Sequence, residues 1–166
     1  MKLAKAPKRI RPSFPKEWNV SSRPDMWLTW SRTERKLKRE LVYWVTSVRA
    51  DGRPHAAPLW GIWLDDSLFF ETDPDSVKAQ NIKRDPSVIV HTQDGYDTVI
   101  VEGLASIEDR PQVLKKLNKM YEAKYDYKPD WSIDSSQKVY RVDPTRVHAW
   151  KNPHMHANMV KFVFGP

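Results

Sequence analysis

Short alternations of hydrophobic and polar residues fill the chain from residue 41 onward and predict β-strands. The segments are rich in β-branched and aromatic residues, and most are bounded by Asp, Gly or Pro. The predicted strands are LVYWVTSV (41–48), HAAPLWGIWL (55–64), SLFFET (67–72), SVIVHTQ (87–93), TVIVEGLASIE (98–108), QKVYRV (137–142), RVHAW (146–150) and MVKFVF (159–164).

The connections between these strands restrict the architecture. Asp51-Gly52, Asp65-Asp66 and Asp94-Gly95 predict tight turns, which are too short for the helical crossover of a parallel sheet. Pro58 indicates a sheet edge or a bulge, and Gly103 a bend. We therefore expect a mainly β fold with helices (α+β), a closed or split antiparallel barrel.

Three segments with a helical period interrupt or precede the strands. The first is predicted to begin at Pro24 and to carry DMWLTWSRTERKLKREL. The second runs from Asp75 to Arg84 and is stopped by Pro86. The third is RPQVLKKLNKMYEAKYDY, residues 110–127, in which hydrophobic residues recur at helical spacing.

Length and composition are those of one domain with a real core. The chain has 166 residues and no cysteine, which excludes a disulfide framework and thiolate metal ligands. Neither a long apolar segment nor a signal-peptide pattern is present, so we expect a cytoplasmic protein without membrane contact.

The positive charge is concentrated at the N-terminus. Residues 1–40 carry 12 Lys and Arg against 4 Asp and Glu, whereas residues 41–166 carry 16 against 17. Such a body makes a nucleic-acid-binding domain unlikely. We divide the chain into a basic arm, residues 1–25, and a folded domain, residues 26–166. The arm is predicted to be solvated; packing on a partner subunit, or contact with nucleic acid or an anionic surface, are the alternatives.

The stretch DSVKAQNIKRDP, residues 75–86, places Ser76 and Lys78 in the first turn of the second helix. A serine there commonly caps the helix, and the lysine is commonly solvated. The alternative is an anion site, because the helix N-terminus offers free N–H groups and a positive pole, to which Ser76 adds a hydroxyl and Lys78 a full charge.

The order of several motifs resembles the pyridoxamine 5′-phosphate oxidase-like superfamily of flavin-binding split barrels. The family pattern G-x-P…P-V-W is matched by Gly52 to Pro54 and Pro58 to Trp60, and Y-F-x-T is matched by FFET, residues 69–72. S-x-K-x-x-N-L-x-x-D-P is matched by residues 76–86. The similarity extends over roughly Tyr43 to Lys151, through VIVEG and VYRVDPTRVHAW.

The resemblance implies a homodimer with a flavin-type cofactor in each of two interface clefts and with Ser76 and Lys78 on the cofactor phosphate. It implies that Trp150 reaches the cofactor from the other subunit. The cofactor-binding residues that we carry over onto this chain are His55, Pro58, Trp60, Thr72, Ser76, Lys78, Asn81 and Trp150.

The chain departs from the oxidase itself at several positions. His55 and Trp60 stand where the oxidase has an arginine and a second lysine, and Met159 stands near a downstream arginine common in relatives. Because the phosphate of pyridoxamine phosphate needs cationic partners, we do not expect that substrate.

The resemblance favours an oxidoreductase that uses FMN or, alternatively, the deazaflavin coenzyme F420 on a small molecule. No residue is identified as its general acid or base, because the cofactor carries the redox step. The alternative is a non-catalytic flavin- or haem-binding protein on the same barrel. Trp60, Trp63 and Trp150 are candidates for an apolar floor under a planar ring.

The histidines are weaker candidates for chemistry. His154 and His156 would share one face of a strand, as two metal ligands do, but no carboxylate or cysteine close in sequence completes a set, and we expect no metal. His91 is predicted to be a satisfied barrel residue, and His55 is the better candidate for a cofactor contact.

Overall fold

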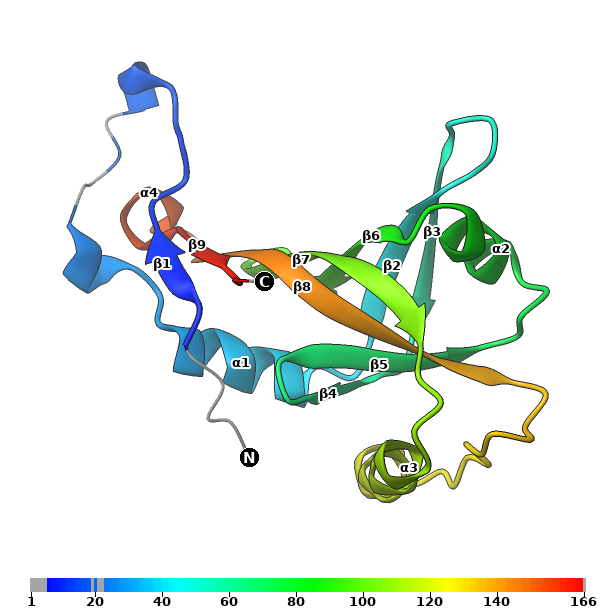
Figure 1. The fold of residues 1–166 in the computed structure, drawn as a ribbon. Coiled ribbons are helices and arrows are strands. Elements are labelled where there is room, and N and C mark those ends of the chain that lie inside the picture. Colours follow the sequence, from blue (N-terminus) through cyan, green and yellow to red (C-terminus); the bar gives the residue numbers. More distant parts are fainter. Residues whose placement is uncertain (1–5, 19, 21–22, 166) are drawn as a thin grey trace.

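The computed structural model describes residues 6–18, 20 and 23–165, and within them a single antiparallel sheet curves around the main core (Figure 1). The strands are β1 (Lys8–Ile10), β2 (Tyr43–Val48), β3 (Pro54–Leu59), β4 (Ile62–Leu64), β5 (Ser67–Thr72), β6 (Ser87–Thr92), β7 (Asp97–Ile107), β8 (Lys138–Lys151) and β9 (Val160–Val163). The helices are α1 (Trp30–Arg39), α2 (Val77–Arg84), α3 (Pro111–Tyr125) and α4 (Met155–Asn158), with 3₁₀ turns η1 (Lys16–Trp18) and η2 (Pro24–Met26).

The sheet has the order β1-β9-β8-β7-β6-β2-β3, with β5 also paired to β8 and β4 paired to β5. No ladder among the described residues joins β3 to β4, so the barrel stays open there. The predicted α+β class and split antiparallel barrel are thereby confirmed. The Asp51-Gly52 hairpin is also confirmed, with Gly52 at φ 83°, and β3, which contains Pro58, lies at a sheet edge.

β8 differs from the prediction, because QKVYRV and RVHAW are two halves of one strand. Its first half pairs with β5 and its second half with β9, while β7 follows it along the whole other edge. The register shifts beside Gly103, where Thr145 is the extra residue and its hydroxyl donates to the Glu102 carbonyl at 3.1 Å. Pro144 and the bulge at Thr145 therefore interrupt the pairing locally, but β8 continues past them.

Two other predicted boundaries were wrong. HAAPLWGIWL is divided into β3 and β4 at Trp60-Gly61, because Gly61 approaches the neighbouring strand too closely for a side chain. The first helix begins at Trp30 rather than at Pro24, since the Thr29 hydroxyl caps it by accepting from the Arg32 N–H at 3.3 Å.

The basic arm contributes a strand that the sequence pattern did not predict. β1 pairs with β9, and the Arg9 guanidinium lies 5.8 Å from the ring centre of Trp27. Trp18 meets His156 edge to face, with ring centres 5.5 Å apart. The described part of the arm therefore contacts the body of its own chain.

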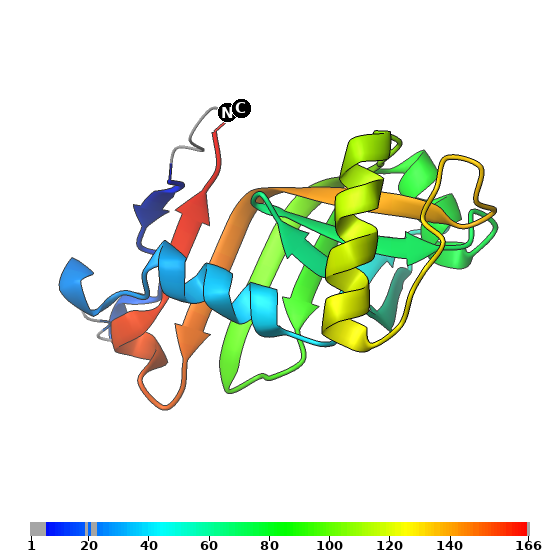
Figure 2. The ribbon, with the colours of Figure 1, turned by 90° about the horizontal axis from the view of Figure 1, so that it is seen from below.

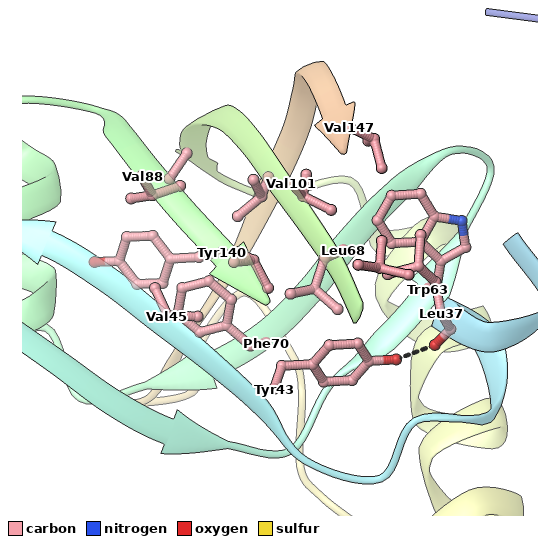
Figure 3. Packing of buried hydrophobic residues seen from close by; sticks show 14 of the residues in the cluster. Leu37, Tyr43, Val45, Trp63, Leu68, Phe70, Val88, Val101, Tyr140 and Val147 are labelled. Carbon is pink, nitrogen blue, oxygen red and sulfur yellow. Dashed lines mark hydrogen bonds between the residues drawn. The ribbon is translucent and has the colours of Figure 1, made fainter. Parts of the chain in front are cut away.

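The core has two parts on opposite faces of β4 and β5. The main cluster fills the barrel and includes Tyr43, Trp63 and Phe70, and the Tyr43 hydroxyl donates to the Leu37 carbonyl at the end of α1 (Figure 3). A second cluster lies between α3 and the sheet, around Leu117 and Phe69. Figure 2 shows α1 and α3 on the same side of the barrel. Within the described residues, no helix has the length and apolar character needed to cross a bilayer.

Gly103 provides a test of the β7–β8 crossing. A Cβ atom there would lie 2.6 Å from the Asp143 carbonyl oxygen and 2.9 Å from a Val142 methyl group. Because a backbone atom cannot yield easily, we expect Gly103→Ala to lower the free energy of unfolding by about 1–3 kcal/mol in urea titrations.

The matched control is Gly95→Ala, because no atom lies within 4 Å of a Cβ atom at Gly95. We expect a change of less than about 0.5 kcal/mol there. Equal stabilities of the two variants would contradict the importance of the close approach.

Candidate functional site

The start of α2 is built by local hydrogen bonds that the sequence encodes. The Asp75 N–H donates to the Asp73 carboxylate at 2.8 Å, which turns the chain after β5. Ser76 is the N-cap, and its hydroxyl accepts from the Ala79 N–H at 3.3 Å. The N–H groups of Val77 and Lys78 lie at the open end of the helix, where an anion can accept from them.

Three predicted site residues meet at this helix start. The Lys78 ammonium donates to the Thr72 hydroxyl at 2.8 Å, and the hydroxyls of Thr72 and Ser76 are 3.0 Å apart. We call Thr72, Ser76, Lys78 and the adjacent His55 the α2 cradle. Burial lowers the pKa of Lys78, and no carboxylate of the described residues forms an ion pair with it.

His55 brings a second basic group to the cradle from β3. It lies opposite Ser47 in the β2–β3 ladder, and its Nδ1 atom is buried without a hydrogen-bond partner among the described residues. Burial is the largest cause that lowers the pKa of His55, followed by the charges of Arg49 and Lys78. The positive charges of Arg49 and Lys78 therefore both act at His55, and a bound anion would favour the protonated imidazole.

Asn81 lies behind the cradle rather than at its surface. It is 4% exposed, and its side-chain amide donates to the Ser47 hydroxyl at 3.0 Å. The bond joins α2 to β2 and thereby sets the position of Lys78 relative to His55. A direct contact between Asn81 and a cofactor remains a prediction.

The other predicted site residues lie away from the cradle in this chain. Pro58 is exposed on the outer face of the sheet opposite Trp44, and Trp60 is 47% exposed and stacks on Tyr125 at 4.8 Å. Trp150 lies near the end of β8 opposite Thr98. Its predicted approach to a cofactor from a second subunit remains a prediction.

The proposed floor of three tryptophans does not form within the chain. Trp63 is packed into the main core and is only 2% exposed, so it offers no face to a planar ring. Trp60 contacts Tyr121 and Tyr125 of α3 instead. The aromatic partner of Trp60 is thus a helix that the sequence pattern did not connect with it.

The C-terminal histidines do not share a strand face as predicted, because His154 occupies the residue before α4, without a side-chain cap, and His156 lies within α4. No group of three or more metal-ligating side chains occurs in the part of the chain that the structure describes. His91 is 2.9 Å from the Thr92 carbonyl through Nδ1 and stacks on Trp44.

Sequence reasoning missed two residues of this region. Arg49 comes from the β2–β3 turn, where a basic residue is ordinarily solvated, yet its charge acts on His55. Tyr125 fixes Trp60 and accepts from the Gly61 N–H at 2.9 Å. Its position in the helical pattern of α3 indicated only that it could be part of the core.

The composition of the cradle suits the phosphate of a cofactor. It combines a hydroxyl at a helix N-terminus with an ammonium group and a buried imidazole nitrogen, which have no counter-ion and no hydrogen-bond partner, respectively, in the described part of the chain. These groups donate hydrogen bonds to oxyanions.

The family model for pyridoxamine 5′-phosphate oxidase matches residues 31–151. A comparison with curated proteins gave no match. Among solved structures, the chain is similar to one titled F420 reductase, with 28% identity over 69% of this chain and 94% of that chain and a TM-score of 0.54.

Two further solved structures share the fold at lower identity. A conserved hypothetical protein from Mycobacterium tuberculosis has 21% identity over 81% of this chain and 92% of that chain, with a TM-score of 0.68. A haem-binding protein from Mycobacterium smegmatis has 15% identity over 78% of this chain and 55% of that chain, with a TM-score of 0.63.

The repulsion within the cradle can be measured on His55. Since the charge of Lys78 helps to lower the pKa of His55, we expect that pKa to rise in Lys78→Ala, as followed by NMR titration of the imidazole. Lys83→Ala is the control, because Lys83 lies in the last turn of α2. An unchanged His55 titration in Lys78→Ala would contradict the proximity of the Lys78 ammonium to His55.

Proposed function

Because the chain belongs to the pyridoxamine 5′-phosphate oxidase family, we propose that it is an oxidoreductase that uses a flavin-type cofactor, FMN or F420, on a small molecule. The observation that carries this proposal is the α2 cradle, in which the neutral Thr72 hydroxyl is the one hydrogen-bond partner of the Lys78 ammonium among the described residues. A lysine in the first turn of a helix is commonly solvated, whereas burial lowers the pKa of Lys78.

The cradle would hold the cofactor phosphate. Lys78 would donate a charge-assisted hydrogen bond to it, and Ser76 would donate its hydroxyl proton. His55 would donate from its unpartnered Nδ1 in the tautomer that protonates that atom. FMN and F420 both carry a phosphate group, so the cradle itself does not select between them. The similarity to the F420 reductase supports the deazaflavin as strongly as the family supports FMN.

The bound cofactor supplies hydride transfer, and the chain supplies binding, orientation and exclusion of water. β3 leads from His55 at the cradle to Trp60 at its far end, where Tyr125 stacks on the indole. A cofactor extended along this strand would have its phosphate and its ring system gripped at opposite ends. Trp60 would then orient the ring, while the cradle anchors the phosphate.

The proposal includes a homodimer with the cofactor at the interface. The outer face of the sheet exposes Val48, Ile89 and Leu104, which are 41%, 42% and 49% exposed. These side chains line a shallow cavity of about 360 Å³ on that face. A second subunit would cover this apolar patch, and Trp150 would then be available to the partner's cofactor.

A second candidate function is non-catalytic binding of a flavin or haem. It is supported by the fold that the chain shares with the haem-binding protein from Mycobacterium smegmatis, and the α2 cradle would hold a phosphate with or without turnover. Reduction of the loaded protein followed by a panel of acceptors separates the two, since turnover occurs only in an oxidoreductase.

We expect Lys78→Ala to weaken FMN binding by roughly tenfold to a hundredfold, because a charge-assisted hydrogen bond contributes about 1.5–3 kcal/mol. The measurement is a fluorescence titration with FMN, riboflavin and F420. Riboflavin, which lacks the phosphate, should bind wild type and variant alike. Ser76→Ala should lose less, and part of its loss is helix capping.

Lys83→Ala is the matched control within α2, since Lys83 lies at the opposite end of the helix and cannot reach the cradle. Its affinity for each ligand should equal that of wild type. A Lys78→Ala defect of equal size with FMN and riboflavin would refute the phosphate clamp, as would equal affinity of Lys78→Ala and wild type for every phosphorylated ligand.

We expect Leu104→Glu to dissociate the dimer, because the added carboxylate would be buried against the partner's apolar patch. Sedimentation velocity should show a dimer for wild type and a species near the 19.5 kDa chain mass for the variant. Ile133→Glu is the control, since Ile133 is 53% exposed and lies outside the patch. A wild-type protein that is monomeric at micromolar concentration would overturn the dimer.

A further inference from the structure

A second cavity lies between α1 and α3 and shares no residue with the α2 cradle. Its volume is about 690 Å³, within the range of small-molecule sites. β4, residues Ile62–Leu64, lies along it, and Met120 and Ala123 of α3 add apolar surface. Figure 2 shows the two helices on this side of the barrel. We call this space the α1–α3 cavity.

Lys124 brings an ammonium group to the wall of the cavity. It donates to the Gly61 carbonyl at 2.9 Å and to the Tyr43 hydroxyl at 3.2 Å, and lies 5.0 Å and 5.1 Å from the ring centres of Tyr43 and Tyr125. An ammonium has three donors, so one is left over after these two neutral acceptors. No carboxylate among the described residues forms an ion pair with Lys124.

The other cations of the cavity are already paired. Lys38 lies 2.6 Å from the Glu34 carboxylate, and Lys116 lies 3.6 Å from the Asp65 carboxylate. In each of these pairs the carboxylate neutralises the charge of the lysine. Among the described residues that line the cavity, Lys124 is therefore the one cation that has no paired carboxylate.

Asp66 is the corresponding carboxylate without an ion pair among those lining residues. It belongs to the β4–β5 turn, where its φ is 61°. Burial is the largest cause that raises the pKa of Asp66, followed by the like charge of Glu34. The cavity thus has an ammonium group on α3 and a carboxyl group on the β4–β5 turn that do not pair with each other.

We propose that the α1–α3 cavity binds a small carboxylate-bearing molecule with an apolar body, whose carboxylate is held by Lys124 and whose other end donates a hydrogen bond to Asp66. The apolar body would cover β4 and Met120, and its burial would contribute to affinity. The carboxylate would fill the remaining donor of Lys124 and compensate a desolvated charge, which the charge of Glu40 offsets only in part.

The protonation of Lys124 gives this proposal a pH signature. Burial lowers the pKa of Lys124 to about 8, against which the charge of Glu40 acts. The titratable groups that face it are Glu40 at the end of α1, Tyr43 of β2 and Tyr125 of α3. Burial raises the pKa of both tyrosines, so they stay neutral near pH 8. A carboxylate ligand should bind more weakly as the pH rises from 7 to 9.

The experiment uses three probes with the same apolar body: 4-phenylbutyrate, 4-(4-aminophenyl)butyrate and 4-phenylbutylamine. Isothermal titration of the full chain should show binding of both carboxylates at pH 7, with the amino derivative tighter because it donates to Asp66. The affinity of both should fall by pH 9. The amine should bind more weakly than either carboxylate. No binding of 4-phenylbutyrate, or preference for the amine, would overturn the proposal.

Matched variants locate the probe. Lys124→Met keeps the apolar stem and should weaken 4-phenylbutyrate by at least about tenfold, whereas Lys116→Met should change it by less than about threefold. Asp66→Gly, which tolerates the φ of 61° and removes the acceptor, should abolish the advantage of the amino derivative. Lys78→Ala should bind all three probes as wild type does, which keeps this test separate from that of the cofactor. Equal affinities of wild type and Lys124→Met would contradict the assignment.

A second measurement on wild type covers the case in which Lys124→Met does not fold. Acetic anhydride at pH 8 should acetylate Lys124, as located by mass spectrometry, and 4-phenylbutyrate should protect it while leaving Lys116 reactive. Acetylation of Lys124 that 4-phenylbutyrate does not reduce would place the probe elsewhere and overturn the proposal.

Discussion

The two-sided pairing of β8 is the constraint on which the rest of the structure depends. One edge of this strand follows β7 from end to end, while the other edge changes partner from β5 to β9. The change is possible because Gly103 lets the Asp143 carbonyl approach and Thr145 is accommodated as a bulge. Through β7 and β6 the strand carries β2 and β3, and through β5 it carries β4. The open side between β3 and β4 is the consequence.

The position of α2 on this open barrel determines where the charge of Lys78 lies. α2 lies against the end of β2, held by the buried hydrogen bond between Asn81 and Ser47. This position places the Lys78 ammonium close enough to His55 for its charge to lower the pKa of that imidazole, which favours the neutral form. Burial partly desolvates the charge of Lys78, and an anionic ligand that binds this charge would stabilise the folded state. The polar partners of Lys78 are neutral, so its charge remains available to a ligand.

The same logic applies on the other side of the barrel, where Lys124 crosses from α3 to the β3–β4 junction. Its hydrogen bond to Gly61 fixes the residue after Trp60, and Tyr125 stacks on the Trp60 ring. α3 is thereby tied to the strand that leads to the cradle. Lys78 and Lys124 are both half-buried and both have neutral hydrogen-bond partners. In our proposals each binds a different ligand.

The sequence by itself determined most strands, the turns, the helix cap at Ser76 and its spacing from Lys78, because these depend on neighbours within a few residues. The order of the motifs also indicated the family and predicted the split barrel. Only the tertiary structure decided that β8 is continuous, that Trp63 is core and that His55 and Arg49 act on the cradle. It alone brought Lys124 to Gly61 and Tyr43, which are 63 and 81 residues away in the chain. Periodicity gives the face on which a side chain lies, but its distant neighbours depend on how the bent sheet and the helices pack.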